Sequence, residues 1–170
     1  MKITRISPLV VNAEMRNWIF IRVETDQPGL YGWGEATLEW KTRAVTGAVE
    51  DLSPLVIGRD PLQINQLVRI MKKQSFWRLG AVGSSAASGI EIALWDILGK
   101  HFGCPVWQLL GGKVRDRVKV YTHLGMGQME SVYETLDEDP LLQRAADVVE
   151  NGYNAVKIVN IPYTHYSVKI

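Results

Sequence analysis

Two residues with reactive side chains, His123 and Lys157, lie in segments that are predicted to be β-strands. Residues 117–123 alternate between polar and apolar types, and residues 155–161 are mostly apolar, and both patterns are typical of strands. An imidazole titrates near neutral pH and can give or take a proton. An ammonium group removed from water gives up its proton more readily, or it binds an anion. His123 and Lys157 are therefore the first candidates for acid–base chemistry or for binding an acid.

Both residues also have structural explanations, and the sequence leaves these open. A histidine at the end of a strand can simply hydrogen-bond to its neighbours. Lys157 lies between Val156 and Ile158, so its stem can follow the apolar surface while the ammonium reaches the rim or pairs with a structural acid. As a functional residue, Lys157 would be buried and would act as a base or as the cation that faces a carboxylate substrate.

A predicted helix joins these two strands. Asp139-Pro140 is a start signal for a helix, and Asn151-Gly152 is a stop signal. Two strands joined by a helical crossover lie parallel, and α/β arrays bind ligands at the carboxyl ends of their strands. His123 and Lys157 are thus expected at one sheet edge. Because parallel strands need cover on both faces, the segment from residue 116 onward is expected to begin a larger α/β array.

The preceding part of the chain predicts an antiparallel meander followed by helices. The three strands span residues 2–11, 18–25 and 30–35, and Asp26-Gln27-Pro28-Gly29 forms the turn between the second and third strands. Apolar residues at helical spacing predict helices over 45–56 and 60–71, the second with Asp60 as its N-cap, and a third helix through 90–98 that ends at Gly103. The small residues of 80–89 favour close helix packing over an anion-binding loop, because no P-loop lysine follows them.

Two loops of this region carry further candidates for ligand binding. Arg16-Asn17-Trp18 lies between the first two strands, and Glu39-Trp40-Lys41 follows the third. Loops with charged, amide and indole side chains suit the recognition of a hydroxylated acid. The alternative is that these residues are helix caps and amphipathic surface residues.

The amino-acid composition excludes several classes of protein. The 170 residues are 46% hydrophobic and 22% charged with a net charge of +1, which is typical of a globular protein and predicts no nucleic-acid partner and no anionic membrane partner. No apolar run approaches the roughly 20 residues of a membrane span. Cys104 is the only cysteine and the three histidines are scattered, so neither a disulfide nor a preassembled zinc site is expected. A cytoplasmic location is expected.

Several ordered motifs resemble the N-terminal capping domain of the enolase superfamily, and within it the acid-sugar dehydratases of the mandelate racemase-like group, the galactonate and mannonate dehydratases. The motifs are Tyr31-Gly32-Trp33-Gly34-Glu35-Ala36, Ile57-Gly58-Arg59-Asp60-Pro61, Ala93-Leu94-Trp95-Asp96-Ile97 and Pro105-Val106-Trp107-Gln108-Leu109-Leu110-Gly111-Gly112. The resemblance implies an α+β capping domain over residues 1–115. It also implies that residues 116–170 are the first βαβ of a TIM-type barrel, which is incomplete because a full barrel needs about 250 residues.

The resemblance also implies roles for the candidate residues. Asn17 and His123 match positions that touch substrate in mannonate-type members, and Lys157 matches the first lysine of the Lys-x-Lys pair that serves racemase-like members as base. Val159 stands in place of the second lysine, which makes racemisation less expected. The loops around Arg16, Trp18, Glu39 and Trp40 are expected to set substrate specificity.

The implied reaction is the Mg²⁺-dependent dehydration of a sugar acid to a 2-keto-3-deoxy acid, through abstraction of the proton α to the carboxylate. The metal ligands of the family lie on later barrel strands, beyond residue 170, so the 170-residue chain by itself is expected to be inactive. The resemblance favours a homo-oligomer. The alternatives are a non-catalytic cap-like domain that binds a small acid or a protein partner, and a racemase or cycloisomerase of the same superfamily.

Overall fold

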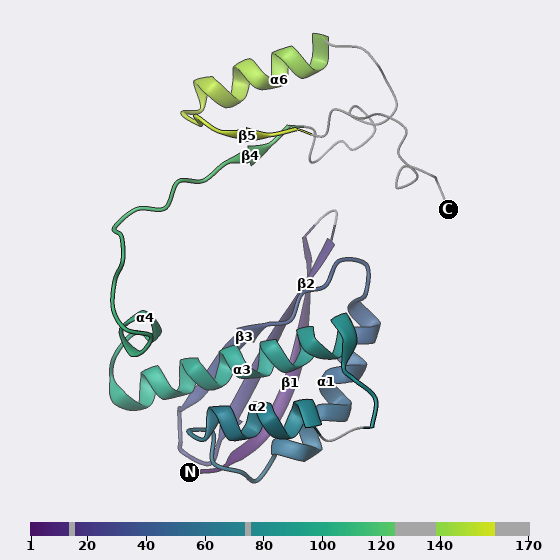
Figure 1. Cartoon of the computed structure of the whole chain (residues 1–170), viewed down its shortest axis with the longest axis vertical. Helices are drawn as coiled ribbons and strands as arrows, with labels where there is room; N and C mark the ends of the chain where they lie inside the picture. Colours follow the sequence, from purple (N-terminus) through teal and green to yellow (C-terminus); the bar gives the residue numbers. More distant parts are fainter. Residues whose placement is uncertain (14–15, 74–75, 125–138, 159–170) are drawn as a thin grey trace. The chain divides into compact units, whose positions relative to one another are not determined.

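The computed structural model describes residues 1–13, 16–73, 76–124 and 139–158 (Figure 1). The chain divides into two compact units, Met1–Val114 and Arg115–Ile170. No helix among the described residues has both the length and the apolar character needed to cross a lipid bilayer.

The first unit contains an antiparallel sheet with the strand order β1-β2-β3, as predicted. Its strands are β1 (Ile3–Ala13), β2 (Arg16–Thr25) and β3 (Tyr31–Glu35). Gly29 has a φ of 78° in the turn before β3, where Leu30 N donates a hydrogen bond to Gln27 O at 3.1 Å. Glycine adopts this left-handed conformation without steric cost, which explains the turn signal of the sequence.

Helices cover one face of this sheet (Figure 1). They are α1 (Thr42–Val56), α2 (Ile64–Lys73) and α3 (Gly80–Phe102), and a short helix α4 (Val106–Leu109) follows. The alternating residues of β2 and the apolar stripes of the helices meet in one core, whose largest fully buried side chains include Ile19, Ile21, Val23, Val45, Val49, Leu52, Leu67, Met71, Ile90, Leu94 and Ile97. The predicted helix end at Gly103 is confirmed by its φ of 67°.

The second helix begins later than the sequence predicts. Asp60 Oδ1 accepts a hydrogen bond from Leu62 N at 3.1 Å, and Asp60 O accepts one from Gln63 N at 3.2 Å. These bonds close a tight turn, and α2 begins only at Ile64. The prediction that Asp60 caps the helix is wrong, because its side chain is used by the turn that precedes the helix.

The small residues of 80–89 lie inside α3 and allow it to approach the sheet closely. A Cβ added to Gly89 would lie 2.6 Å from the Cβ of Ala36, and one added to Gly34 would overlap the carbonyl oxygen of Gly89. Such distances leave no room for a side chain at either position. The close-packing interpretation of this segment is therefore confirmed.

The second unit contains the predicted strand–helix–strand arrangement. Its elements are β4 (Thr122–His123), α6 (Asp139–Glu150) and β5 (Val156–Lys157), and β4 pairs with β5 in parallel. Both strands are shorter than predicted: residues 117–121 are not in a strand, and residues 159–161 lie outside the described part of the chain. A strand is defined by hydrogen bonds to a neighbour, and in the described part of this unit β4 and β5 have only each other.

Candidate functional site

Candidates from both predicted loops come together at the turn end of the β1–β2 hairpin, where Ala13 pairs with Arg16. The guanidinium of Arg16 forms an ion pair with the carboxylate of Glu39, which lies in the segment between β3 and α1. Trp40 follows with a φ of 58°, which is uncommon for a residue other than glycine, and its indole is exposed. The structure thus brings Arg16 and Glu39 together. The prediction that residues 16–18 form a loop between strands is wrong, because they pair with β1 as the first residues of β2.

Asn17 is held by side chains on both sides of its carboxamide. Its Nδ2 donates a hydrogen bond to Thr42 Oγ1 at 3.3 Å, and its Oδ1 accepts one from Asn12 Nδ2 at 3.4 Å. Sequence reasoning missed Asn12 and Thr42. Asn12 is the cross-strand partner of Asn17 in the hairpin, so the register would have revealed it, whereas Thr42 is brought there by the start of α1.

Trp18 does not join this group. Its ring makes an edge-to-face contact with Phe20 at 5.9 Å between centroids. Successive residues of a strand point to opposite faces, and Ile19 and Ile21 are buried under the helices. Trp18 and Phe20 therefore lie on the other face of the sheet from Asn17.

In the second unit, His123 and Lys157 are register partners on adjacent parallel strands. Neighbours in register project to the same face of a sheet, and paired strands lie about 4.8 Å apart. His123 Nδ1 lies 2.9 Å from Leu124 O. A carbonyl oxygen only accepts, so Nδ1 carries the hydrogen and Nε2 of the neutral ring holds the lone pair. The arrangement places an imidazole beside an ammonium group on one face of the sheet.

Lys157 is exposed rather than buried, so of the two interpretations left open by the sequence the structure matches the one in which the ammonium reaches the rim. The flanking Val156 and Ile158 are 46% and 41% exposed. In the described chain β5 has one neighbouring strand, so its other edge is unpaired, and both of its residues are exposed.

The described residues do not fit a Mg²⁺ site. No three His, Cys, Asp or Glu side chains of the described ranges lie close enough together to bind a metal ion. Mg²⁺ takes oxygen ligands in octahedral geometry, commonly one or two carboxylates with substrate oxygens and water.

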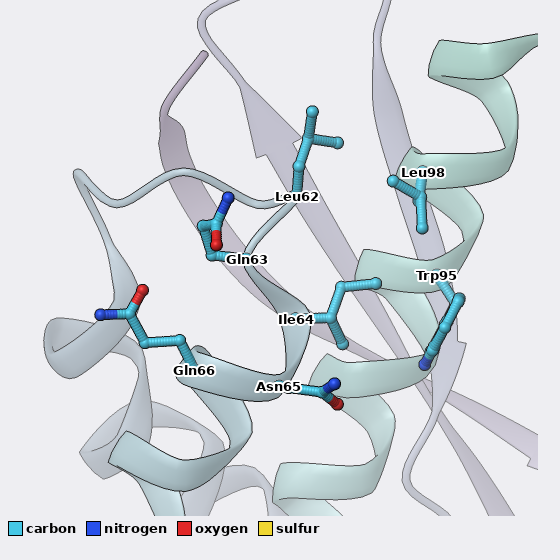
Figure 2. A pocket seen from close by; sticks show the side chains of 7 residues that line it. All are labelled: Leu62, Gln63, Ile64, Asn65, Gln66, Trp95 and Leu98. Atoms are coloured by element: carbon cyan, nitrogen blue, oxygen red, sulfur yellow. The ribbon is translucent and has the colours of Figure 1, made fainter.

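Two pockets of the first unit lie away from the candidate residues. One, of about 190 Å³, lies between the start of α2 and α3, where Ile64 and Asn65 face Trp95 and Leu98 (Figure 2). The other, of about 450 Å³, lies between α1 and the start of α3. Neither is lined by Arg16, Asn17, Trp18, Glu39 or Trp40.

The three-stranded meander with helices on one face is the capping-domain architecture of the enolase superfamily. A family model described as the mandelate racemase / muconate lactonizing enzyme N-terminal domain matches residues 4–111. The chain belongs to this family.

Relatives in sequence include proteins named D-galactonate dehydratase. The chain is 50% identical to the one from Verminephrobacter eiseniae over 125 residues, which cover 74% of this chain and 32% of that protein. It is 40% identical to the one from Variovorax paradoxus over 163 residues, which cover 95% of this chain and 41% of that protein. The chain thus spans about a third to two fifths of the length of these relatives.

Solved structures show the same relationship. An enolase from Pantoea ananatis with bound D-gluconate and Mg is 34% identical, with a TM-score of 0.80 over 93% of this chain and 36% of that chain. A member of the enolase superfamily from Salmonella Typhimurium is 34% identical, with a TM-score of 0.80 over 92% of this chain and 42% of that chain.

Proposed function

We propose that this chain forms the cap and the first two barrel strands of an acid-sugar dehydratase. The reaction removes the proton α to the carboxylate of an aldonate or aldarate and expels the β-hydroxyl as water, giving a 2-keto-3-deoxy acid. The observation that carries the proposal is the register pairing of His123 with Lys157 at the carboxyl ends of β4 and β5. In α/β barrels this end of the strands is the end that binds substrate.

Each residue has a role that its contacts support. Lys157 binds the substrate carboxylate or takes part in proton transfer, and its exposure in this chain leaves the ammonium available to an anion. His123 uses Nε2 to accept a hydrogen bond from a substrate hydroxyl, since Nδ1 is engaged by Leu124 O. Asn17 binds a second hydroxyl with a carboxamide whose orientation is set by Asn12 and Thr42.

The loops near the hairpin end set specificity. The ion pair between Arg16 and Glu39 fixes the path of the segment that carries Trp40, whose exposed ring offers an apolar surface to a sugar carbon chain. Trp18 is left out of this proposal because its ring packs against Phe20 and not against the Arg16–Glu39 pair.

A bound Mg²⁺ would stabilise the negative charge that develops on the carboxylate as the α proton leaves. The described residues hold no donor set for it, and from the resemblance to the enolase superfamily we propose that its ligands lie on later barrel strands. We therefore expect the 170-residue chain alone to be inactive, because no metal ion would stabilise the negative charge that develops on the substrate carboxylate.

The test is a chimera in which this chain replaces the matching segment of the Variovorax paradoxus relative. We expect the folded chimera to dehydrate a sugar acid such as D-galactonate or D-gluconate, measured as release of 2-keto acid, while the 170-residue chain gives none. Lys157→Met and His123→Asn are expected to lower kcat/KM by about a hundredfold or more, and Lys119→Met serves as a matched control.

Three results would count against the proposal. They are a folded chimera without turnover of any sugar acid, full activity in Lys157→Met, and turnover by the 170-residue chain alone. Binding of a sugar acid by calorimetry without turnover in the chimera would instead favour the non-catalytic alternative.

A further inference from the structure

Trp40 combines an unfavourable backbone conformation with an exposed ring. Its φ of 58° makes it the only residue other than glycine with a positive φ in the described part of the chain. This left-handed region is disfavoured for any residue that has a Cβ, because the Cβ comes too close to the following carbonyl oxygen. The side chain is 73% exposed, and none of the ring contacts among the described residues involves it. Ring contacts within the described chain therefore do not offset the cost of this conformation.

The segment around Trp40 is fixed on both sides of this residue. Glu39, which precedes it, forms the ion pair with Arg16 on β2. Lys41, which follows it, donates a hydrogen bond from its backbone N–H to Leu38 O at 3.1 Å and so closes the turn. A strained conformation persists only where the surrounding structure over-determines it, and such residues cluster at active sites and ligand clamps.

The same segment leads to Asn17. Thr42 is the first residue of α1, and its Oγ1 accepts the hydrogen bond from Asn17 Nδ2 at 3.3 Å. Trp40 is thus separated from this contact by a single residue. An open-chain sugar acid presents both hydroxyl groups and C–H groups. A carboxamide can bind the hydroxyl groups, and the face of an indole can pack against the C–H groups.

We propose that Trp40 is a substrate-binding residue, and that its strained backbone holds the indole ready to pack against the carbon chain of the sugar acid. This inference rests on the proposed function, in which Asn17 binds a hydroxyl of the same ligand. For the stability of the cap alone, glycine would suit this position better, because it adopts a positive φ without steric cost. Loss of the ring is therefore expected to weaken substrate binding, whereas glycine at this position is expected to relieve the strain.

Thermal unfolding of the 170-residue chain tests the strain. Trp40→Gly removes the Cβ and Trp40→Ala keeps it, so the glycine variant is expected to have the higher Tm, by about 2–6 °C. At a position with an ordinary negative φ the order is reversed, because glycine gains more conformational freedom on unfolding. Trp107, an exposed tryptophan in α4, is the matched control, and Trp107→Ala is expected to have a higher Tm than Trp107→Gly.

Substrate binding is tested in the chimera with the Variovorax paradoxus relative. Trp40→Ala and Trp40→Gly are each expected to raise KM for D-galactonate about tenfold and to change kcat by less than about threefold, since the ring binds substrate and takes no part in proton transfer. Trp40→Phe retains an aromatic face and is expected to stay within about threefold of the parent KM. Trp107→Ala is expected to leave KM unchanged.

Tryptophan fluorescence gives a readout that needs no turnover. D-Galactonate is expected to quench the emission of the parent chimera, and the quench is expected to be lost in Trp40→Phe and retained in Trp107→Phe. Circular dichroism of each variant shows whether it is folded.

Three results overturn the inference. They are a higher Tm for Trp40→Ala than for Trp40→Gly, a parent-like KM for D-galactonate in both of these variants, and a chimera in which no quench depends on Trp40. A quench that depends on Trp40 in a chimera without turnover supports the binding role and contradicts only the dehydratase proposal. Turnover with a parent-like KM in Trp40→Ala contradicts only the binding role, so the two proposals fail separately.

Discussion

The exposed edge of β3 is held by two charged residues of α3. Trp33 N donates a hydrogen bond to Asp96 Oδ2 at 2.8 Å, and Lys100 Nζ donates to Tyr31 O at 2.9 Å and to Asp96 Oδ2 at 2.7 Å. β3 is the outermost strand of the sheet, and its free backbone groups would otherwise be open to another chain. The Asp96–Lys100 pair therefore anchors the helix to the sheet and satisfies the sheet edge.

Asp96→Ala removes both hydrogen bonds to the carboxylate. Hydrogen bonds to charged groups contribute about 1.5–3 kcal/mol each when buried. The side chains of Asp96 and Lys100 are 31% and 41% exposed, and solvent weakens such contacts, so the expected loss of unfolding free energy is about 2 kcal/mol in total. Asp96→Asn retains an acceptor for Trp33 N and is expected to cost about 1 kcal/mol.

Urea unfolding measures this effect through the midpoint, with an unchanged slope as the sign that only stability has changed. A domain of this size is expected to lose roughly 4–8 °C in Tm per kcal/mol. Glu50→Ala, an exposed acid on α1, is the control and is expected to stay within about 0.5 kcal/mol. The reasoning is refuted if Asp96→Ala unfolds within that same margin of the parent.

Three further predictions concern packing and local stability. Gly34→Ala places a Cβ against the backbone of α3 and is expected to lower the free energy of unfolding by at least about 2 kcal/mol. Gly47 has open space around it, so Gly47→Ala is expected to stabilise α1 by about 0.5–1 kcal/mol. Urea unfolding midpoints that do not move in opposite directions for the two variants contradict this reasoning. Leu94→Ala removes a fully buried side chain and is expected to cost about 2–5 kcal/mol in the same assay. Amide hydrogen exchange is expected to be faster in β4 and β5 than in β2, and equal protection would show that the second unit is as well packed as the first.

The sequence predicts the fold of the first unit because its signals are local. Alternation in β2 specifies which face is buried, and Gly29 and Gly103 adopt the left-handed conformations that end a turn and a helix. Asp60 shows the limit of such signals, since the same residues can start a helix or close a turn. Which of the two forms depends on how the following turn packs, and that is a tertiary property.

The candidate site could be predicted only in part, because some of its contacts follow from strand pairing and others join distant segments. Strand register places Asn12 beside Asn17, and the parallel crossover places His123 beside Lys157, so both neighbourhoods follow from chain connectivity. The contact between Arg16 and Glu39 joins a strand to a distant loop. No periodic pattern in the sequence predicts that Arg16 and Glu39 come together.

Side-chain contacts hold Asn17 in the first unit more firmly than they hold His123 and Lys157 in the second unit. In the first unit, Asn17 is fixed by the side chains of Asn12 and Thr42. In the described part of the second unit only Leu124 and Val148 are buried, and parallel strands ordinarily need layers on both faces. Backbone pairing alone thus sets the distance between His123 and Lys157. Any polypeptide that packs against β4 and β5 would therefore also set the surroundings of both side chains.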